Sequence, residues 1–199
     1  MSNKEMSRRV DRRDLLKVGG TVTAATGLAL LGSTSHARAL RRSGSIVSEP
    51  IASDLAVMQG ALALEHEGIA AYRLAAGSGL LSHDTIAVAG VFLGHHQGHR
   101  DALARLIAKA GGKPVEPKSD SEYTSSLGLA RLKSEADVVR FAAGLEQGAA
   151  NAYVGQVAAL RDGKLARLFS QLGTDEAVHW ALLNSAAGGT VPKRPFLFG

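Results

Sequence analysis

Six side chains of metal-binding type occur at regular positions in this sequence, each on an otherwise apolar helical stripe. They are Glu65, His96, His99, Glu146, Glu176 and His179. The two pairs His96/His99 and Glu176/His179 have i, i+3 spacing. The two side chains of each pair therefore project from the same helix face and can bind one metal ion. The chain has no cysteine, so a metal centre must use histidine and carboxylate ligands.

The spacing of these residues repeats along the chain. His96 follows Glu65 by 31 residues, and Glu176 follows Glu146 by 30. Each of the two single glutamates is also followed, seven residues later, by a tyrosine. These tyrosines are Tyr72 and Tyr153. The pattern indicates an internal duplication of a helical hairpin, with a period of about 80 residues.

Four segments with helical periodicity must position these side chains, and no sustained strand-type alternation occurs after Ile51. The first helix is expected from about residue 51 to the glycines at 77 and 79, and the second over 82–110. The third is expected to begin at Ser134, and the fourth after residues 161–163. Each is about 25 residues long, typical of a helical bundle.

The lengths of the connections predict the topology. Short turns join the first two helices and the last two, so each pair should form an antiparallel hairpin. Residues 112–133 are rich in serine, proline and charge and are expected to form a solvated loop, long enough to run the length of a 25-residue helix of about 38 Å. The sequence therefore predicts an all-α four-helix bundle over 51–187, built from two antiparallel hairpins and one long crossover. A tail over 188–199 is expected to pack Phe196 and Phe198 on the bundle or a neighbour.

The six side chains are also expected at one level of the bundle. Each hairpin places its single glutamate and its i, i+3 pair at similar distances from the connecting turn, so the groups should meet in the centre. Three carboxylates in a dry core each cost several kcal/mol if unpaired, and no Lys or Arg lies on the stripes at that level. One or two divalent cations would neutralise them, and protonation is the alternative.

The sequence resembles the ferritin-like superfamily of carboxylate-bridged di-iron bundles, and more narrowly the exported members related to rubrerythrin and bacterioferritin. The resemblance rests on residues 61–72 (ALALEHEGIAAY), 145–153 (LEQGAANAY) and 175–179 (DEAVH). It implies a transition-metal cofactor, with iron as the first candidate and manganese or zinc as alternatives. It also implies Fe(II) oxidation or peroxide removal, with dioxygen or peroxide as partner, and leaves open whether the chain forms a homo-oligomer.

The resemblance assigns roles to the six residues. Glu65 and Glu146 would be terminal ligands, Glu176 a bridging carboxylate, and His99 and His179 one histidine for each metal. Tyr72 and Tyr153 would be hydrogen-bond partners of carboxylates. The neighbours His66, Glu67, His95 and Asp175 lie off the stripes and are expected to face solvent.

One position departs from the family pattern. The family's second helix carries Glu-x-x-His, whereas residues 96–99 read His-Gln-Gly-His, so His96 replaces a bridging carboxylate. Two close ions would share three carboxylates instead of four, which leaves a di-iron, a single-metal and a mixed centre open. Whether the protein is an enzyme also stays open, the alternative being a non-catalytic structural, metal-binding or stress-associated bundle.

The first 39 residues resemble a twin-arginine export signal. Arg12 and Arg13 precede a mildly apolar stretch over 18–31 and a small-x-small site at 37–39. We expect export to the periplasm or cell envelope, with 40–50 as a linker and a retained signal anchor as the alternative. This segment carries +4 of the net charge of +5, so the remainder gives no support for a nucleic-acid partner. Membrane contact is expected only through the signal.

Overall fold

The computed structural model describes residues 49–199, so the expected export signal lies outside the described residues. The elements, in chain order, are α1 (Glu49–Ala76), α2 (His83–Lys109), α3 (Asp120–Ser126), the short 3-10 helix η2 (Leu129–Arg131), α4 (Glu135–Val157) and α5 (Gly163–Ala186). This part of the chain contains no strand. None of its helices has both the length and the apolar character needed to cross a membrane.

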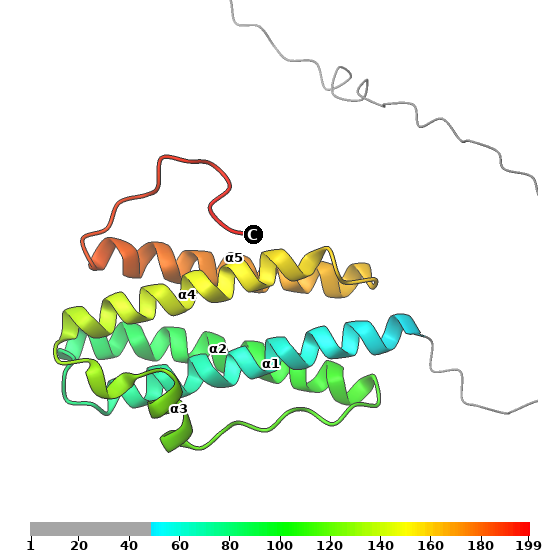
Figure 1. Cartoon of the computed structure of the whole chain (residues 1–199), viewed down its shortest axis with the longest axis horizontal. Helices are drawn as coiled ribbons and strands as arrows, with labels where there is room; N and C mark the ends of the chain where they lie inside the picture. Colours follow the sequence, from blue (N-terminus) through cyan, green and yellow to red (C-terminus); the bar gives the residue numbers. More distant parts are fainter. Residues whose placement is uncertain (1–48) are drawn as a thin grey trace, which may run out of the picture. The chain divides into compact units, whose positions relative to one another are not determined.

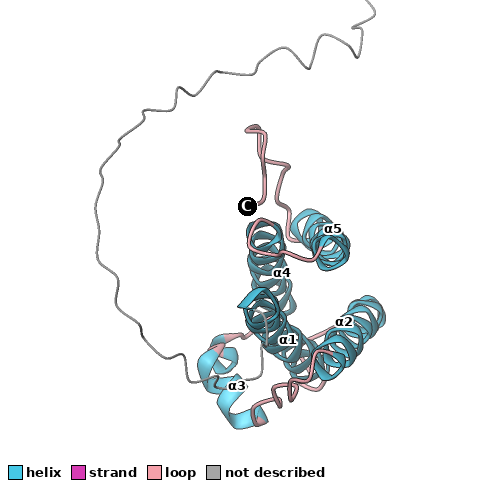
Figure 2. Cartoon of the chain, turned by 90° about the vertical axis from the view of Figure 1, so that its right-hand side faces the viewer, coloured by secondary structure: helices cyan, strands magenta, loops and turns pink. Residues whose placement is uncertain are grey.

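Two helical hairpins pack against each other to form the bundle. α1 pairs with α2 and α4 pairs with α5, and the hairpins meet where α1 packs on α4 (Figure 1). The end-on view separates the four long helices and places α3 beside α1 (Figure 2). The prediction of an all-α bundle with one long crossover is confirmed.

Polar side chains fix where the long helices begin. Ser82, Ser134 and Asp162 are the N-caps of α2, α4 and α5, and each side chain accepts a hydrogen bond from a backbone N–H of the first turn. Asp54 of α1 is buried and accepts bonds from the backbone N–H groups of Arg161 and Asp162, at 3.0 Å each. The start of α1 is thereby tied to the turn between α4 and α5.

The crossover is more ordered than the sequence led us to expect. The prediction of a solvated loop is wrong over 120–126, which form α3. Its start is a capping box, because the Ser119 hydroxyl accepts from the Glu122 N–H while the Glu122 carboxylate accepts from the Ser119 N–H. Tyr123 is buried and Asp120 forms an ion pair with Arg73 of α1, so the helix is attached to the bundle.

Two apolar clusters make the core, and the polar residues lie between them. One cluster contains Leu62, Leu103, Tyr153 and Phe169, together with other buried residues of all four long helices. The other contains Tyr72, Phe92, Ala142 and Leu183 with two further alanines. Each cluster contains one of the two tyrosines that follow a predicted ligand by seven residues, Tyr153 in the first cluster and Tyr72 in the second. The layer of glutamates and histidines therefore has apolar packing on both of its sides along the bundle.

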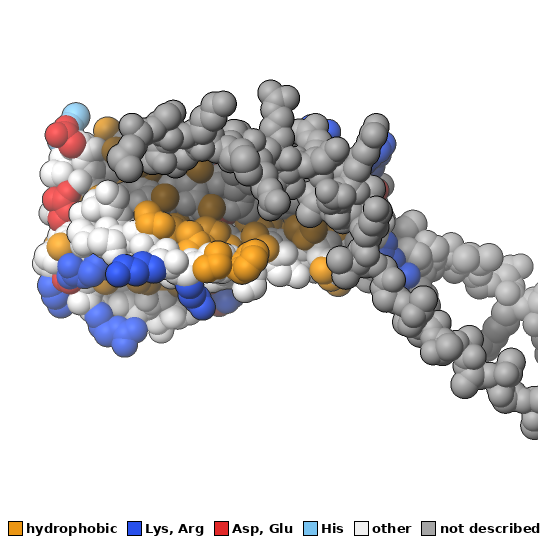
Figure 3. Space-filling model, turned by 90° about the horizontal axis from the view of Figure 1, so that it is seen from above, with side chains coloured by type: hydrophobic (Ala, Val, Ile, Leu, Met, Phe, Trp, Pro, Cys, Tyr) orange, Lys and Arg blue, Asp and Glu red, His pale blue; other side chains and the backbone are white. Residues whose placement is uncertain are grey.

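The C-terminal tail returns to the bundle. Phe198 packs edge-on against Trp180 with ring centroids 5.2 Å apart, and the Gly199 N–H donates to the Asn151 side chain. Phe198 therefore packs as expected, whereas Phe196 is 93% exposed and is not packed against the bundle formed by residues 49–199. Figure 3 shows exposed apolar side chains beside Lys and Arg on one face. The exposed large apolar residues of α4, α5 and the tail are Val154, Val178, Leu182, Val191 and Phe196.

Candidate metal centre

The six predicted ligands come together at one level of the bundle, and all are buried, with at most 8% of their surface exposed. They form two groups whose ligand atoms lie within 4.8 Å of one another. One group is Glu65, His96, His99 and Glu176, and the other is Glu146, Glu176, His179 and His96. His96 and Glu176 belong to both groups, so they occupy the shared positions.

Glu176 divides its two oxygens between the groups. Oε1 lies 3.1 Å from Nδ1 of His99, and Oε2 lies 3.1 Å from Nδ1 of His179. Two ligand atoms bound to one ion at right angles, with bonds of roughly 2.1 Å, lie about 3 Å apart. The carboxylate is therefore placed to serve two neighbouring metal positions.

Three buried atoms of the centre have no hydrogen-bond partner among the described residues: His99 Nδ1, Glu146 Oε2 and Glu176 Oε1. Such groups are rare in folded proteins, because an unsatisfied buried polar atom costs roughly 1–3 kcal/mol. His99 Nδ1 and Glu176 Oε1 even approach to 3.1 Å without forming a hydrogen bond. Each of the three atoms belongs to a residue of one of the two groups, and a cation bound in that group would satisfy it, so the residues present fit a metal.

His96 fills the second shared position with different chemistry. Its Nδ1 lies 2.8 Å from Glu65 Oε2, and its Nε2 lies 3.3 Å from Glu146 Oε1. A neutral imidazole has one nitrogen with a free lone pair. His96 can therefore ligate in one group at a time, whereas a carboxylate at this position would serve both.

The two tyrosines connect the hairpins in a crossed pattern. Tyr72 of α1 donates its hydroxyl to Glu146 of α4, and Tyr153 of α4 donates to Glu65 of α1. Burial, together with the adjacent carboxylate, raises the pKa of both hydroxyls, so they remain protonated donors. Each hairpin thus supplies the hydroxyl donor that holds a buried glutamate of the other hairpin.

Two residues expected to face solvent also contact the centre. His95 shares a hydrogen bond with Nε2 of His179 at 2.8 Å, and Asp175 lies 3.2 Å from Nε2 of His99. Both side chains are exposed, as expected, but that expectation missed their contacts. Each directly precedes a shared residue, His96 or Glu176, so the repeat of about 80 residues was the signal that could have identified them.

These outer contacts determine which nitrogen of each histidine faces the centre. His99 and His179 are hydrogen-bonded through Nε2 and present Nδ1 to the glutamates. Phe92 stacks on the His179 ring with a centroid distance of 4.2 Å. Outer partners of this kind orient metal-ligating histidines and raise their basicity.

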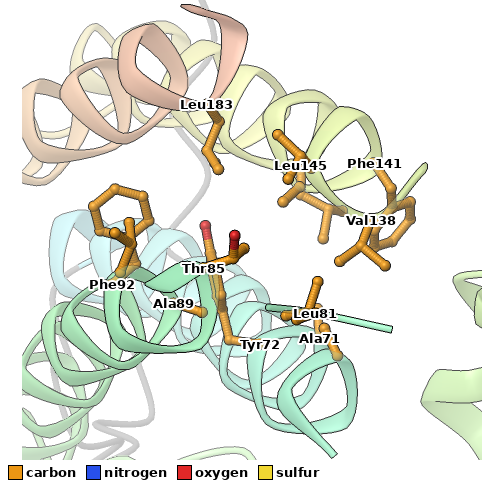
Figure 4. Close-up of a pocket in the computed structure, with 14 residues that line it drawn as sticks. Ala71, Tyr72, Leu81, Thr85, Ala89, Phe92, Val138, Phe141, Leu145 and Leu183 are labelled. Atoms are coloured by element: carbon orange, nitrogen blue, oxygen red, sulfur yellow. The ribbon is translucent and has the colours of Figure 1, made fainter. Parts of the chain in front are cut away.

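A glycine makes room for the shared histidine. A Cβ on Gly68 would lie 3.1 Å from the His96 ring, closer than ordinary van der Waals contact. Gly68 was not predicted as a site residue, although a glycine in a helix interior, three residues after Glu65, is a visible signal in the sequence. Beside the centre, Tyr72, Phe92 and Leu183 help to line an apolar pocket of about 40 Å³ (Figure 4).

The charges of the centre can balance without a metal. Burial alone would lower the pKa of the imidazoles, but the carboxylates of Glu146 and Glu65 outweigh it and raise the pKa of His96 to about 11. Glu176 and Glu65 likewise raise the pKa of His99 to about 10. Burial would raise the pKa of Glu65, but the two histidines lower it below its usual range. A cation is therefore not required by the absence of Lys and Arg from the stripes, because these imidazoles can carry the positive charge.

The metal-free protein should therefore lose stability as the pH rises above neutrality. A histidine whose pKa is raised by folding contributes stability that is present below its unfolded pKa of about 6.5 and lost as the pH approaches the folded value. The expected slope is up to about 1.4 kcal/mol per pH unit for each imidazole protonated only in the folded state. Denaturant titrations of chelator-treated protein from pH 6 to pH 9 measure it. A constant free energy of unfolding over this range would contradict the prediction.

Asp175→Asn should weaken metal binding without removing a ligand. Loss of an outer partner of a metal-bound histidine commonly lowers affinity by about 10–100-fold, and Asp175 is the partner of His99. Competition with a chromophoric chelator measures the affinity. The matched control is Asp101→Asn, an exposed aspartate on α2 that pairs with Arg100; equal affinities of both variants would show that Asp175 does not support the centre.

Two helical hairpins joined by one long crossover, with glutamates and histidines buried between them, are the architecture of the ferritin-like class of helical proteins. The chain belongs to the ferritin-like domain family, which matches residues 53–189. The buried His and Glu groups of this domain could hold a metal ion.

A solved structure supports the assignment of the fold. It is the crystal structure of a conserved hypothetical protein, Rv2844, from Mycobacterium tuberculosis, and it superposes with a TM-score of 0.62. The two sequences are 23% identical, and the match covers 73% of this chain and 97% of that one. At this identity the likeness shows the fold alone. No protein of curated function matches the sequence.

Proposed function

We propose that this protein is an exported ferritin-like metalloprotein that binds one or two transition-metal ions, with iron as the first candidate. The observation that carries the proposal is the pair of buried four-residue groups that share His96 and Glu176. Two atoms of these groups that lack a hydrogen-bond partner, His99 Nδ1 and Glu176 Oε1, lie 3.1 Å apart. Imidazole and carboxylate donors suit iron, manganese and zinc, and iron is often held by two histidines and one carboxylate with open positions.

The proposed chemistry is redox, either Fe(II) oxidation or the removal of peroxide. A bound metal that changes oxidation state would supply the electrons and polarise an oxygen ligand. The chain's own residues provide the scaffold: Tyr72 and Tyr153 hold the terminal glutamates, and His95 and Asp175 hold the histidines. The two apolar clusters pack against the centre from both ends of the bundle and limit its contact with water there.

Metal content tests the binding part of the proposal. The full chain is purified from a metal-replete host and its metals are quantified, beside Glu146→Ala. We expect about one ion or more per chain in the wild type and a clear loss in the variant. Consumption of dioxygen or peroxide after addition of Fe(II) then measures turnover. A metal content near zero in both proteins would contradict the proposal.

A second candidate function is a ferritin-like bundle without turnover. The observation that favours it is the presence of three imidazoles beside three carboxylates, which allows the charges of the polar layer to balance without any ion. Such a protein would have a structural, metal-binding or stress-associated role. The second candidate function predicts that Fe(II) added to the protein is oxidised no faster than Fe(II) in buffer alone, even if the protein binds it.

Export is the remaining part of the proposal and depends on residues 1–39. Replacing Arg12 and Arg13 by lysine should retain the protein in the cytoplasm, because a twin-arginine signal requires the arginine pair. Cell fractionation measures the distribution. Lysine at Arg8 and Arg9 is the matched control, and equal export of both double variants would contradict the assignment.

A further inference from the structure

A second, larger pocket reaches the candidate metal centre from the side where α1 packs on α4. It has a volume of about 240 Å³, and about 10–15 Å³ is enough to hold one water molecule. Its lining includes three members of the centre, Glu65, His96 and Glu146. The remaining lining residues are Leu64, Glu67, Gly68, Tyr72, Gly144, Leu145, Gly148 and Ala149.

Two exposed glycines of α4, Gly144 and Gly148, line this pocket without a side chain that could fill it. A Cβ on Gly144 or Gly148 would meet no atom within 4 Å, so the space beside each glycine is unfilled. Glycine in a helix interior costs roughly 0.5–1 kcal/mol relative to alanine. Neither packing nor a left-handed backbone requires glycine here, since both residues lie inside α4 and neither has a positive φ. A passage that must stay open would explain why α4 has glycine at these two positions, although glycine destabilises a helix.

The pocket has the chemistry of a cation path. Glu67 contributes a carboxylate to its lining, and the unpartnered Oε2 belongs to the buried Glu146 of the same pocket. The apolar pocket of Figure 4 offers almost no polar groups to replace the water molecules around an ion. Removing that water from a charge is costly, so this pocket is a poor path for a cation. On the side where α2 faces α5, the outer nitrogens of His99 and His179 are already hydrogen-bonded.

We infer that the pocket between α1 and α4 is the route by which a hydrated divalent cation reaches and leaves the centre. The absence of side chains at Gly144 and Gly148 makes the pocket wide enough for the ion, and the carboxylate of Glu67 attracts it. This inference rests on the proposed metal binding. It predicts that the pocket controls the rates of metal exchange while the six ligands control the affinity.

Gly148→Leu tests the route directly. Leucine should narrow the pocket and slow both Co²⁺ association and its release to excess chelator by a similar factor, roughly tenfold, which is a barrier increase of about 1.4 kcal/mol. The dissociation constant should stay unchanged, because no ligand is altered. Stopped-flow absorbance of Co²⁺ with the full chain gives both rates. Leucine is also a better helix former than glycine, so folding should not suffer.

The matched control is Gly155→Leu. Gly155 is an exposed glycine of the same helix, its Cβ would also meet no atom within 4 Å, and it lies outside the pocket lining. We expect exchange rates like those of the wild type. Glu67→Gln is a second test that adds no bulk, and it should slow association more at low salt than at high salt.

The outcomes separate the two proposals. Wild-type exchange rates in both Gly148→Leu and Glu67→Gln would overturn the route while leaving metal binding intact. A wild-type protein that binds no Co²⁺, Fe²⁺ or Mn²⁺ would overturn the proposed function and the route with it. An equal slowing in Gly148→Leu and Gly155→Leu would also overturn the route, because a general effect on α4 would explain it.

Discussion

Replacing Glu176 with glutamine is expected to remove high-affinity metal binding. Its two carboxylate oxygens lie 3.1 Å from His99 Nδ1 and from His179 Nδ1, so it is the one carboxylate that serves both groups. The affinity should fall by more than the 10–100-fold that loss of an outer partner alone causes, that is, by over about 100-fold. Metal content and the metal-induced rise in melting temperature of the full chain measure the effect.

The fold should survive the Glu176→Gln substitution. Glutamine has nearly the same size, and a changed hydrogen bond in a buried site costs roughly 1–3 kcal/mol. Metal at 100 times its dissociation constant stabilises a protein by about 2.7 kcal/mol, so the variant should lose this increment. Glu116→Gln, an exposed glutamate of the crossover, is the matched control. Wild-type metal content in Glu176→Gln would show that the centre does not bind metal as proposed.

Replacing His96 with glutamate is expected to raise the capacity for metal to two ions per chain. His96 belongs to both ligand groups, but a neutral imidazole can donate to only one ion, whereas a carboxylate has one oxygen for each. The added negative charge would also reduce the repulsion between two close cations. Titration calorimetry with Mn²⁺ or Co²⁺, and metal analysis after gel filtration, give the stoichiometry.

His83→Glu is the control for this substitution, because His83 is an exposed histidine at the start of the same helix. It should leave the stoichiometry at the wild-type value. If the wild type already binds two ions, or if His96→Glu still binds one, then His96 does not limit the number of metals. The first outcome would point to a histidine that accommodates both ions, and the second to a centre limited elsewhere.

The sequence by itself determined the four long helices and the level of the centre, but not the short helix α3 of the crossover. Apolar residues at i, i+3 and i+4 specify which face of a helix is buried, so the six polar residues on those stripes had to face the core. Helix geometry converts equal distances from a turn into equal heights, which brought Glu65 level with the His96/His99 pair. The repeat of about 80 residues made the second hairpin a copy of the first. These are local or periodic properties that a sequence displays.

Only the tertiary structure decided which side chains meet across the bundle. The crossed bonds of Tyr72 to Glu146 and of Tyr153 to Glu65 join different hairpins, and no spacing within one helix encodes them. His95 and Asp175 were assigned to solvent because they lie off the stripes, yet each reaches a histidine on the facing helix. Helix periodicity gives the direction of a side chain but not what stands opposite it.

The charge balance of the centre was likewise decided in three dimensions. Whether three carboxylates need a cation depends on the distances to the imidazoles, and these place His96 2.8 Å from Glu65. The energy of an ion pair depends on separation and burial, both of which follow from the packing of all four helices. The sequence therefore determined that histidines and glutamates share one layer, and the fold decided that the imidazoles lie close enough to the carboxylates to balance their charge.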